Sequence, residues 1–152
     1  MRLSLSSATL QDWNGDVLVV GLFEGDPAGT TAQLEERFPG LTVALESQDF
    51  KGKSGDQVVV TPLATTPAKV AVMGLGKAEA FDLDSVRQAA AKAAKASLGR
   101  QGRLGLLLPW DGLDPNGAAR SSAEAVQLAL YKDQRFRKEP EPRRAPDALE
   151  LI

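Results

Sequence analysis

The sequence contains neither cysteine nor histidine among its 152 residues. Without cysteine the chain cannot form a disulfide bond, supply a thiolate nucleophile or bind a metal through sulfur. Without histidine it lacks the commonest general base and the commonest transition-metal ligand. Serine-based catalysis loses its usual base, and no Gly-x-Ser-x-Gly motif is present. We therefore expect no catalytic, cofactor-binding or metal-binding residue within this chain.

An excess of one charge is also absent, because 18 Lys and Arg residues face 20 Asp and Glu residues. Domains that bind nucleic acid usually carry a clear basic excess, so we expect no nucleic-acid partner. The longest apolar stretch, residues 17–23, is far shorter than a membrane span, and we expect no membrane partner. The N terminus has neither the apolar core nor the cleavage site of a signal peptide, so we expect a cytoplasmic protein.

The apolar pattern alternates between strand and helix spacing, which predicts an α/β fold with a mixed sheet flanked by helices. The expected strands cover residues 2–6 (half-buried), 17–23, 57–61, 69–73 and 103–108. The expected helices cover residues 30–38, 41–45, 84–98 and 122–136, the first and last opened by capping boxes of Thr30 with Gln33 and Ser121 with Glu124. About seven residues separate the third and fourth strands, too few for a parallel crossover, so this pair should be antiparallel.

Three motifs invite a functional interpretation, and each has a simpler structural one. The GLGK sequence from Gly74 to Lys77 follows a strand, but it lacks the glycine spacing of nucleotide-binding loops and predicts a tight turn with a surface lysine. Asp82 and Asp84 precede a helix, where carboxylates cap the N terminus. Asp111 and Asp114 lie in a Gly/Pro/Asn loop, where Asp stabilises turns.

The basic residues near the C-terminal end are interrupted by acidic ones, which favours a solvated helix end and linker over a polyanion site. These basic residues are Lys132, Arg135, Arg137, Lys138, Arg143 and Arg144. Trp13 and Trp110 are isolated aromatics that we assign to the core or its rim.

The composition changes at residue 138, where three prolines occur within seven residues of mixed charge. This stretch predicts an extended linker. We divide the chain into an α/β domain at residues 1–137, which includes the last helix, and a linker at residues 138–152 that ends where a further domain begins. Leu128 and Tyr131 do not share the apolar stripe of that helix, and we expect a second surface to cover them.

Four segments, each present once, carry a resemblance to a known family. They are GDVLVVGLFEGD at 15–26, FKGKSGD at 50–56, VAVMGLGKAEAFDLDSVRQAAAKAAK at 70–95 and AEAVQLALYKDQRFRKEPEPRRAP at 123–146. Their order and spacing extend over nearly the whole chain, from residue 15 to residue 146. In this order and spacing the chain resembles the N-terminal domain of the leucyl aminopeptidase (cytosol aminopeptidase) family.

The resemblance implies a macro-domain-like three-layer sandwich that is the non-catalytic N-terminal domain of a metal-dependent peptidase. In that family a second domain removes N-terminal residues from peptides with two divalent metal ions, Zn²⁺ or Mn²⁺, and the enzyme is a homo-hexamer. The family's Asn-Thr-Asp-Ala-Glu-Gly-Arg-Leu signature does not occur here, so no site residue can be assigned. The implied partners are the chain's own catalytic domain and neighbouring subunits, with a role in assembly or in access to the active site. The resemblance also implies that the last helix links the two domains, that residues 149–152 are the first strand of the catalytic domain, and that Leu128 and Tyr131 face that domain or a neighbouring subunit.

Two other functions remain open from the sequence. A macro-like fold can bind ADP-ribose or a nucleotide in a crevice at the strand ends, where residues 74–77 would form one edge. Alternatively, the last helix and the tail could recruit a protein partner.

Overall fold

The computed structural model describes residues 1–63, 66–132, 135 and 144–152, and it confirms an α/β fold with a mixed sheet. The strands are β1 (Arg2–Leu5), β2 (Val17–Leu22), β3 (Gln57–Val60), β4 (Lys69–Gly74), β5 (Arg103–Leu107) and β6 (Ala148–Leu151). The helices are α1 (Thr30–Arg37), α2 (Leu41–Ser47), α3 (Leu83–Ala96) and α4 (Pro115–Leu130), with a 3₁₀ turn at Ala78–Ala80. None of the described helices is long and apolar enough to cross a membrane.

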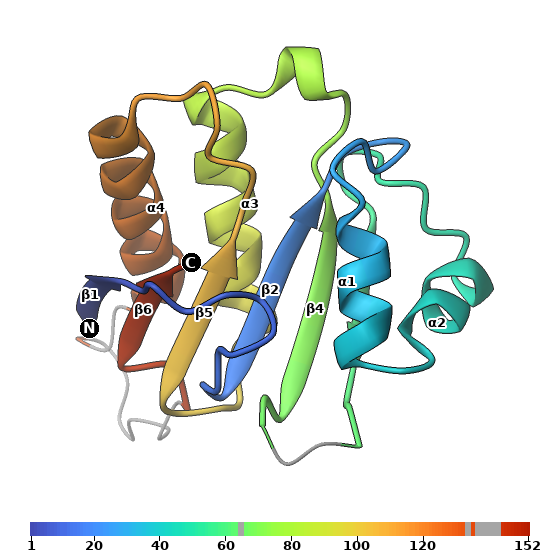
Figure 1. Cartoon of the computed structure of the whole chain (residues 1–152). Helices are drawn as coiled ribbons and strands as arrows, with labels where there is room; N and C mark the ends of the chain where they lie inside the picture. Colours follow the sequence, from blue (N-terminus) through green and yellow to red (C-terminus); the bar gives the residue numbers. More distant parts are fainter. Residues whose placement is uncertain (64–65, 133–134, 136–143) are drawn as a thin grey trace.

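The sheet has the strand order β1-β6-β5-β2-β4-β3 (Figure 1). Its first five strands run parallel, and β3 pairs antiparallel with β4, as the short connection predicts. The β2 strand lies near the middle and is buried along its whole length. Its β-branched composition suits a strand that is covered on both faces.

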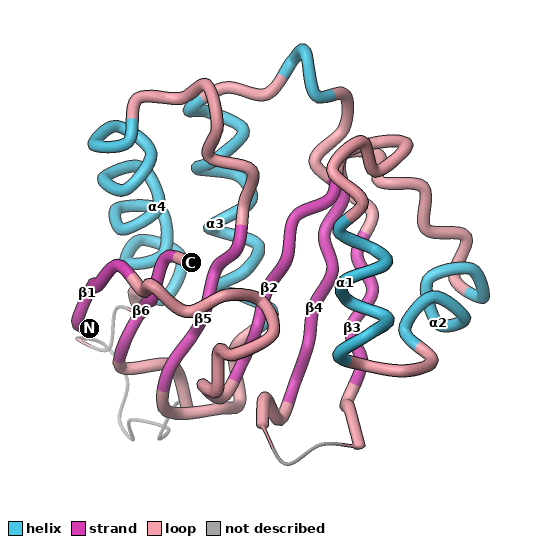
Figure 2. Tube along the Cα trace, viewed as in Figure 1, coloured by secondary structure: helices cyan, strands magenta, loops and turns pink. Residues whose placement is uncertain are grey.

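Helices cover both faces of the sheet, so the expected three-layer sandwich is confirmed (Figures 1 and 2). The α1 and α2 helices pack on one face through Leu34, Leu41 and Leu45. The α3 and α4 helices pack on the other face, and alternate residues of each strand point to one face or the other.

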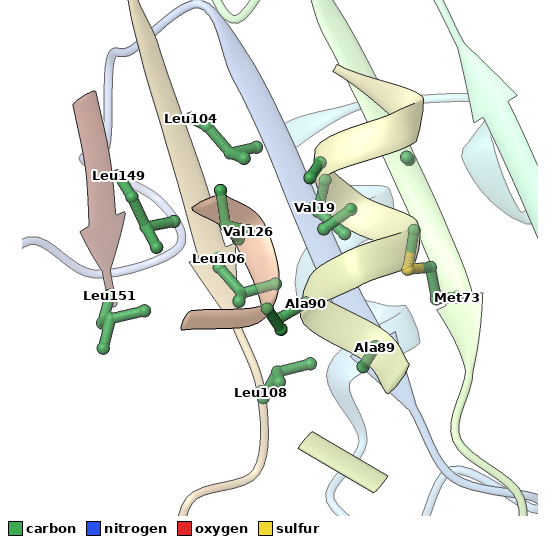
Figure 3. Packing of buried hydrophobic residues seen from close by; sticks show 14 of the residues in the cluster. Val19, Met73, Ala89, Ala90, Leu104, Leu106, Leu108, Val126, Leu149 and Leu151 are labelled. Atoms are coloured by element: carbon green, nitrogen blue, oxygen red, sulfur yellow. The ribbon is translucent and has the colours of Figure 1, made fainter. Parts of the chain in front are cut away.

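Small side chains bring α3 close to both the sheet and α4. Four alanines of α3 are almost fully buried: Ala89, Ala90, Ala93 and Ala94. Figure 3 shows Ala90 beside Leu106 of β5 and Val126 of α4 in the same cluster. Because alanine adds little bulk, two helices fit side by side over the sheet.

The α4 helix begins at Pro115, seven residues before the predicted start, and ends at Leu130. The predicted capping box at Ser121 is wrong, since Ser121 is buried inside the helix. Instead, the Asp114 carboxylate accepts the Gly117 N–H at 2.7 Å and Pro115 takes the first helical position. The predicted end at residue 136 lies outside the described residues.

We expect Asp114→Ala to lower the free energy of unfolding by about 1 kcal/mol, because the first turn of α4 loses its N-cap acceptor. For a domain of this size the melting temperature should fall by about 2 to 4 °C. Thermal unfolding followed by circular dichroism measures this. Asp111→Ala removes an exposed carboxylate from the same loop and is the matched control. An equal loss in both variants would contradict the capping role.

The start of α1 is predicted correctly, but its cap is not. Gly29 occupies the N-cap position and has no side chain to donate or accept. The Asp26 carboxylate, three residues earlier, accepts the N–H groups of Thr30 and Thr31 at 3.0 and 2.8 Å. A loop residue therefore replaces the predicted Thr30–Gln33 capping box.

The two terminal strands also differ from expectation. All four β1 residues are exposed, because β1 is an edge strand that extends beyond the helices. The β6 strand lies between β1 and β5 and pairs with both. It is thus part of this sheet rather than the first strand of a separate domain. The boundary that we placed at residue 138 lies outside the described residues.

Candidate functional site

The GLGK turn joins three backbone segments where β2 and β4 end. Three consecutive N–H groups donate to carbonyl oxygens: Gly74 to Asp56 (2.9 Å), Leu75 to Leu22 (2.8 Å) and Gly76 to Gly52 (2.8 Å). A phosphate-binding loop needs such N–H groups free to point at its ligand. Here the protein's own backbone uses them.

The two glycines of this turn have different causes: Gly76 has a φ of 78°, which side chains rarely adopt, whereas Gly74 lies against fixed backbone. A Cβ atom on Gly74 would overlap the Lys53 carbonyl oxygen and lie 2.7 Å from the Gly52 carbonyl carbon. The neighbouring hollow, which Lys92 helps to line, has a volume of only about 40 Å³. Lys77 is exposed, so the structural interpretation, a tight turn with a surface lysine, is confirmed.

A larger hollow of about 360 Å³ lies at the end of β2, beside the N terminus of α1. A helix N terminus can bind a phosphate through its free N–H groups. In α1 these groups already face the Asp26 carboxylate. The position that an anion would take is therefore filled by a negatively charged side chain of the chain itself.

Three of the four aspartates in the predicted pairs stabilise helices, and the fourth, Asp111, is exposed in the loop before α4. Asp82 and Ser85 form a capping box at the start of α3, with 2.8 Å between the Ser85 N–H nitrogen and the Asp82 carboxylate. Asp84 accepts the Gln88 side-chain amide at 2.9 Å. Asp114 caps α4 and lies apart from these residues in the chain. Nowhere in the described parts of the chain do three or more metal-ligating side chains gather.

Two further carboxylates bind backbone N–H groups, which the sequence analysis did not predict. Glu35 accepts the N–H groups of Gly40 and Thr42 at 2.8 and 2.7 Å and so holds the turn between α1 and α2. Asp56 accepts two N–H groups of the 50–56 loop. Both carboxylates therefore hold loops in place.

Two carboxyl groups whose pKa values are lowered in the folded chain predict how stability depends on pH. Hydrogen bonds from Ser85 lower the pKa of Asp82, and the N–H groups of Gly40 and Thr42 lower the pKa of Glu35. A pKa that is lower in the folded state stabilises the protein above the unfolded pKa, and this stability is lost as the pH falls through the folded pKa.

We therefore expect the melting temperature to stay level between about pH 6 and pH 8, where no side chain of this histidine-free sequence has its ordinary pKa. It should decline below about pH 4. Thermal melts across this range measure the effect. Asp82→Asn keeps a capping oxygen that does not titrate, so its decline should be smaller. A melting temperature that rises between pH 5 and pH 3 would contradict the assignment.

Both tryptophans anchor the C-terminal strand. Trp13 is 1% exposed, and its indole N–H donates to the Glu150 carboxylate at 2.7 Å. Arg103 pairs with the other oxygen of Glu150 at 3.3 Å and lies over the Trp13 ring. Trp110 is half-buried and donates its indole N–H to the Ile152 carbonyl at 2.9 Å. The assignment of the two tryptophans to the core or its rim is confirmed, with Trp13 in the core and Trp110 at its rim.

The predicted basic group is only partly described, since Arg137, Lys138 and Arg143 lie outside the described residues. The Arg144 carbonyl accepts the Gly99 N–H at 2.8 Å, which places Arg144 next to the end of α3. Leu128 and Tyr131 are 77% and 68% exposed. They are thus not packed inside this domain, as our interpretation of them requires.

An apolar groove lies between the end of β1, the end of β6 and the first half of α4, with a volume of about 300 Å³. We call it the β1 groove and define it by Leu5, Ser6, Trp110, Pro115, Ala118, Ala119, Leu151 and Ile152. It contains no charged side chain and one hydroxyl group.

Comparison with known proteins places the chain in a family. The profile of the cytosol aminopeptidase family, N-terminal domain, matches residues 19–140. A probable cytosol aminopeptidase of Synechococcus sp. strain CC9605 is 61% identical over the whole chain, which covers 31% of that relative. A mutant of tomato leucine aminopeptidase is 25% identical with a TM-score of 0.83, over 99% of this chain and 32% of that one.

The macrodomain of Mycobacterium tuberculosis DarG shares the fold, with a TM-score of 0.65 at 16% identity over 98% of this chain and 96% of that one. At this identity the likeness concerns the fold alone. The chain spans about a third of the length of the curated relatives that it matches. With the profile match over most of its residues, the chain belongs to the cytosol aminopeptidase family and corresponds to its N-terminal domain.

Proposed function

We propose that this chain is the non-catalytic N-terminal domain of a metal-dependent aminopeptidase that removes N-terminal residues from peptides. The observation that carries the proposal is the match of the whole chain, at 61% identity, to 31% of a probable cytosol aminopeptidase. The remaining part of such a relative is long enough for a separate catalytic domain. The domain would support assembly or access to the active site of a cytosolic homo-hexamer.

The side chains present in this domain support the assignment of catalysis to a separate domain. An aminopeptidase of this kind needs two divalent ions, which activate water and polarise the scissile carbonyl. The residues described here do not fit such a site, because Asp26, Glu35, Asp56 and Asp82 each accept backbone N–H groups of their own loops or helices. We therefore assign the Zn²⁺ or Mn²⁺ ions and the peptide substrate to the catalytic domain and derive no catalytic step in this one.

The experiment uses a chimera in which the part of the CC9605 relative beyond the aligned segment follows Ile152. We expect the chimera to release leucine from a leucyl anilide when Mn²⁺ or Zn²⁺ is added, and the 152-residue chain to release none under the same conditions. Leucine release by the chain alone would refute the non-catalytic role. An inactive chimera that is folded by circular dichroism would count against the aminopeptidase assignment.

The macrodomain likeness makes ADP-ribose binding the second candidate. Against it stand the occupied N–H groups of the GLGK turn and the Asp26 carboxylate at the α1 N terminus. A ligand at about 100 times its Kd stabilises a protein by roughly 2.7 kcal/mol. We expect no change in melting temperature at millimolar ADP-ribose, and a saturable rise would revive this candidate.

A further inference from the structure

The helix layer over the sheet stops short of β1. In the parallel pairing of β1 with β6, Leu3 lies opposite Leu149 and Leu5 lies opposite Leu151, so each pair points to the same face of the sheet. Leu149 and Leu151 belong to the core that α3 and α4 cover. Leu3 and Leu5 continue the same apolar face but are 43% and 80% exposed.

The β1 groove adjoins this uncovered face. Leu5 lines both, and the opposite wall is formed by Ala118 and Ala119 of α4 and by Trp110. A pocket for a small molecule normally combines an apolar lining with several converging polar groups. This groove offers one hydroxyl, that of Ser6, and no charged side chain, which suits apolar side chains of a polypeptide.

The course of the chain at Ile152 is fixed in the same place. The Ile152 N–H donates to the Leu106 carbonyl at 3.1 Å, and the Ile152 carbonyl accepts the Trp110 indole N–H at 2.9 Å. Figure 1 shows this end of the chain beside α4 and close to β1. Any residue that follows Ile152 therefore leaves the domain at the β1 groove.

We propose that the β1 groove and the exposed face of Leu3 and Leu5 bind the segment that follows Ile152 in the full-length enzyme, through apolar side chains of that segment. This inference rests on the proposed function, since it requires a further domain. The relatives are long enough to contain such a segment, because this chain covers only 31% of the length of the CC9605 relative. The entry point of that segment into the groove is set by Trp110 and Ile152. The groove thus couples the N-terminal domain to the rest of the enzyme.

Hydrogen exchange in the 152-residue chain and in the chimera tests this proposal. We expect amides in peptides covering residues 1–6 and 109–119 to exchange at least about tenfold slower in the chimera, because docking adds to their local stability. Leu5→Glu places a charge in the docked groove and should abolish this slowing. In the 152-residue chain, where Leu5 is 80% exposed, the same substitution should leave the melting temperature unchanged.

Val43→Glu is the matched control, because Val43 is an apolar residue of α2 that is 67% exposed and α2 packs on the other face of the sheet. It should keep the slowing intact. An active chimera with no slowing at these peptides would overturn the docking proposal and leave the proposed function standing. Slowing without peptidase activity would support docking and refute the function. A 152-residue chain that dimerises in sedimentation, with Leu5→Glu abolishing the dimer, would assign the groove to a second copy and overturn the proposal.

Discussion

Gly74→Ala should lower the free energy of unfolding by about 3 kcal/mol, because the new methyl group meets fixed backbone rather than movable side chains. Its neighbours would be the Lys53 carbonyl oxygen and the Gly52 carbonyl carbon, which the hydrogen bonds of the strand-end turn hold in place. The corresponding fall in melting temperature is about 6 to 12 °C for a domain of this size. Denaturant unfolding monitored by tryptophan fluorescence measures the loss.

Gly21→Ala is the matched control from the neighbouring strand. Its Cβ atom would lie 2.6 Å from a methyl carbon of Leu108 and 2.7 Å from one of Leu75, and both are ends of flexible side chains. The cost should therefore be smaller, about 1 kcal/mol. If Gly21→Ala were the more damaging change, the turn at Gly74 would be looser than the structure indicates and the phosphate-loop interpretation would regain support.

Trp13→Ala should destabilise the domain by about 3 to 5 kcal/mol, the usual cost of truncating a buried aromatic residue. The indole fills space against the sheet at 1% exposure. Removal of the indole also leaves the Glu150 carboxylate without its N–H donor. The attachment of β6 to the sheet should therefore weaken in addition to the loss of core packing. Chemical denaturation gives the free energy, and hydrogen exchange in residues 148–152 reports the strand directly.

Tyr131→Ala provides the comparison, since it also removes an aromatic ring, from a site that is 68% exposed. The change in unfolding free energy should stay within about 0.5 kcal/mol. A large loss in Tyr131→Ala would mean that this side chain packs within the domain and would contradict its assignment to an external contact. A small loss in Trp13→Ala would contradict the anchoring role of the indole.

The central part of the fold follows from local sequence signals. The apolar, valine-rich run at residues 17–20 predicts the buried β2 strand, and the short connection before Lys69 predicts the antiparallel β3–β4 pair. The Asp82 cap at the start of α3 is predicted and confirmed. In each case the deciding interaction lies within a few residues of the element that it defines.

The sequence-based predictions are wrong where a residue outside the element, or an unusual residue within it, determines the local structure. Gly117 in the first turn of α4 resembles a loop residue, yet a Cβ atom there would lie 2.8 Å from the Asp114 carboxylate that caps the helix. The β6 strand is four residues long and pairs with β1, more than 140 residues away in the sequence, so no local pattern distinguishes it from the start of another domain. The Asp26 carboxylate that caps α1 lies three residues before the glycine at the N-cap position.

For the candidate sites too, one feature was predictable from the sequence and another was not. That the GLGK turn lacks the spacing of a phosphate loop is visible in the sequence, and the structure supplies the reason in the backbone contacts of Gly74 and Gly76. The β1 groove could not be predicted, because its walls come from β1, α4 and β6, which only the fold brings together. Exposed apolar residues such as Leu5 carry no sequence signal that separates them from core residues.

Equilibrium dialysis of the 152-residue chain against Mn²⁺ and Zn²⁺ tests most directly whether this domain is free of the catalytic metals. We expect no stoichiometric binding at micromolar concentrations of either ion, because the loop carboxylates accept backbone N–H groups and the sequence contains no imidazole or thiolate. Two equivalents of either ion retained by the folded chain would contradict it and would place the metal chemistry within these residues.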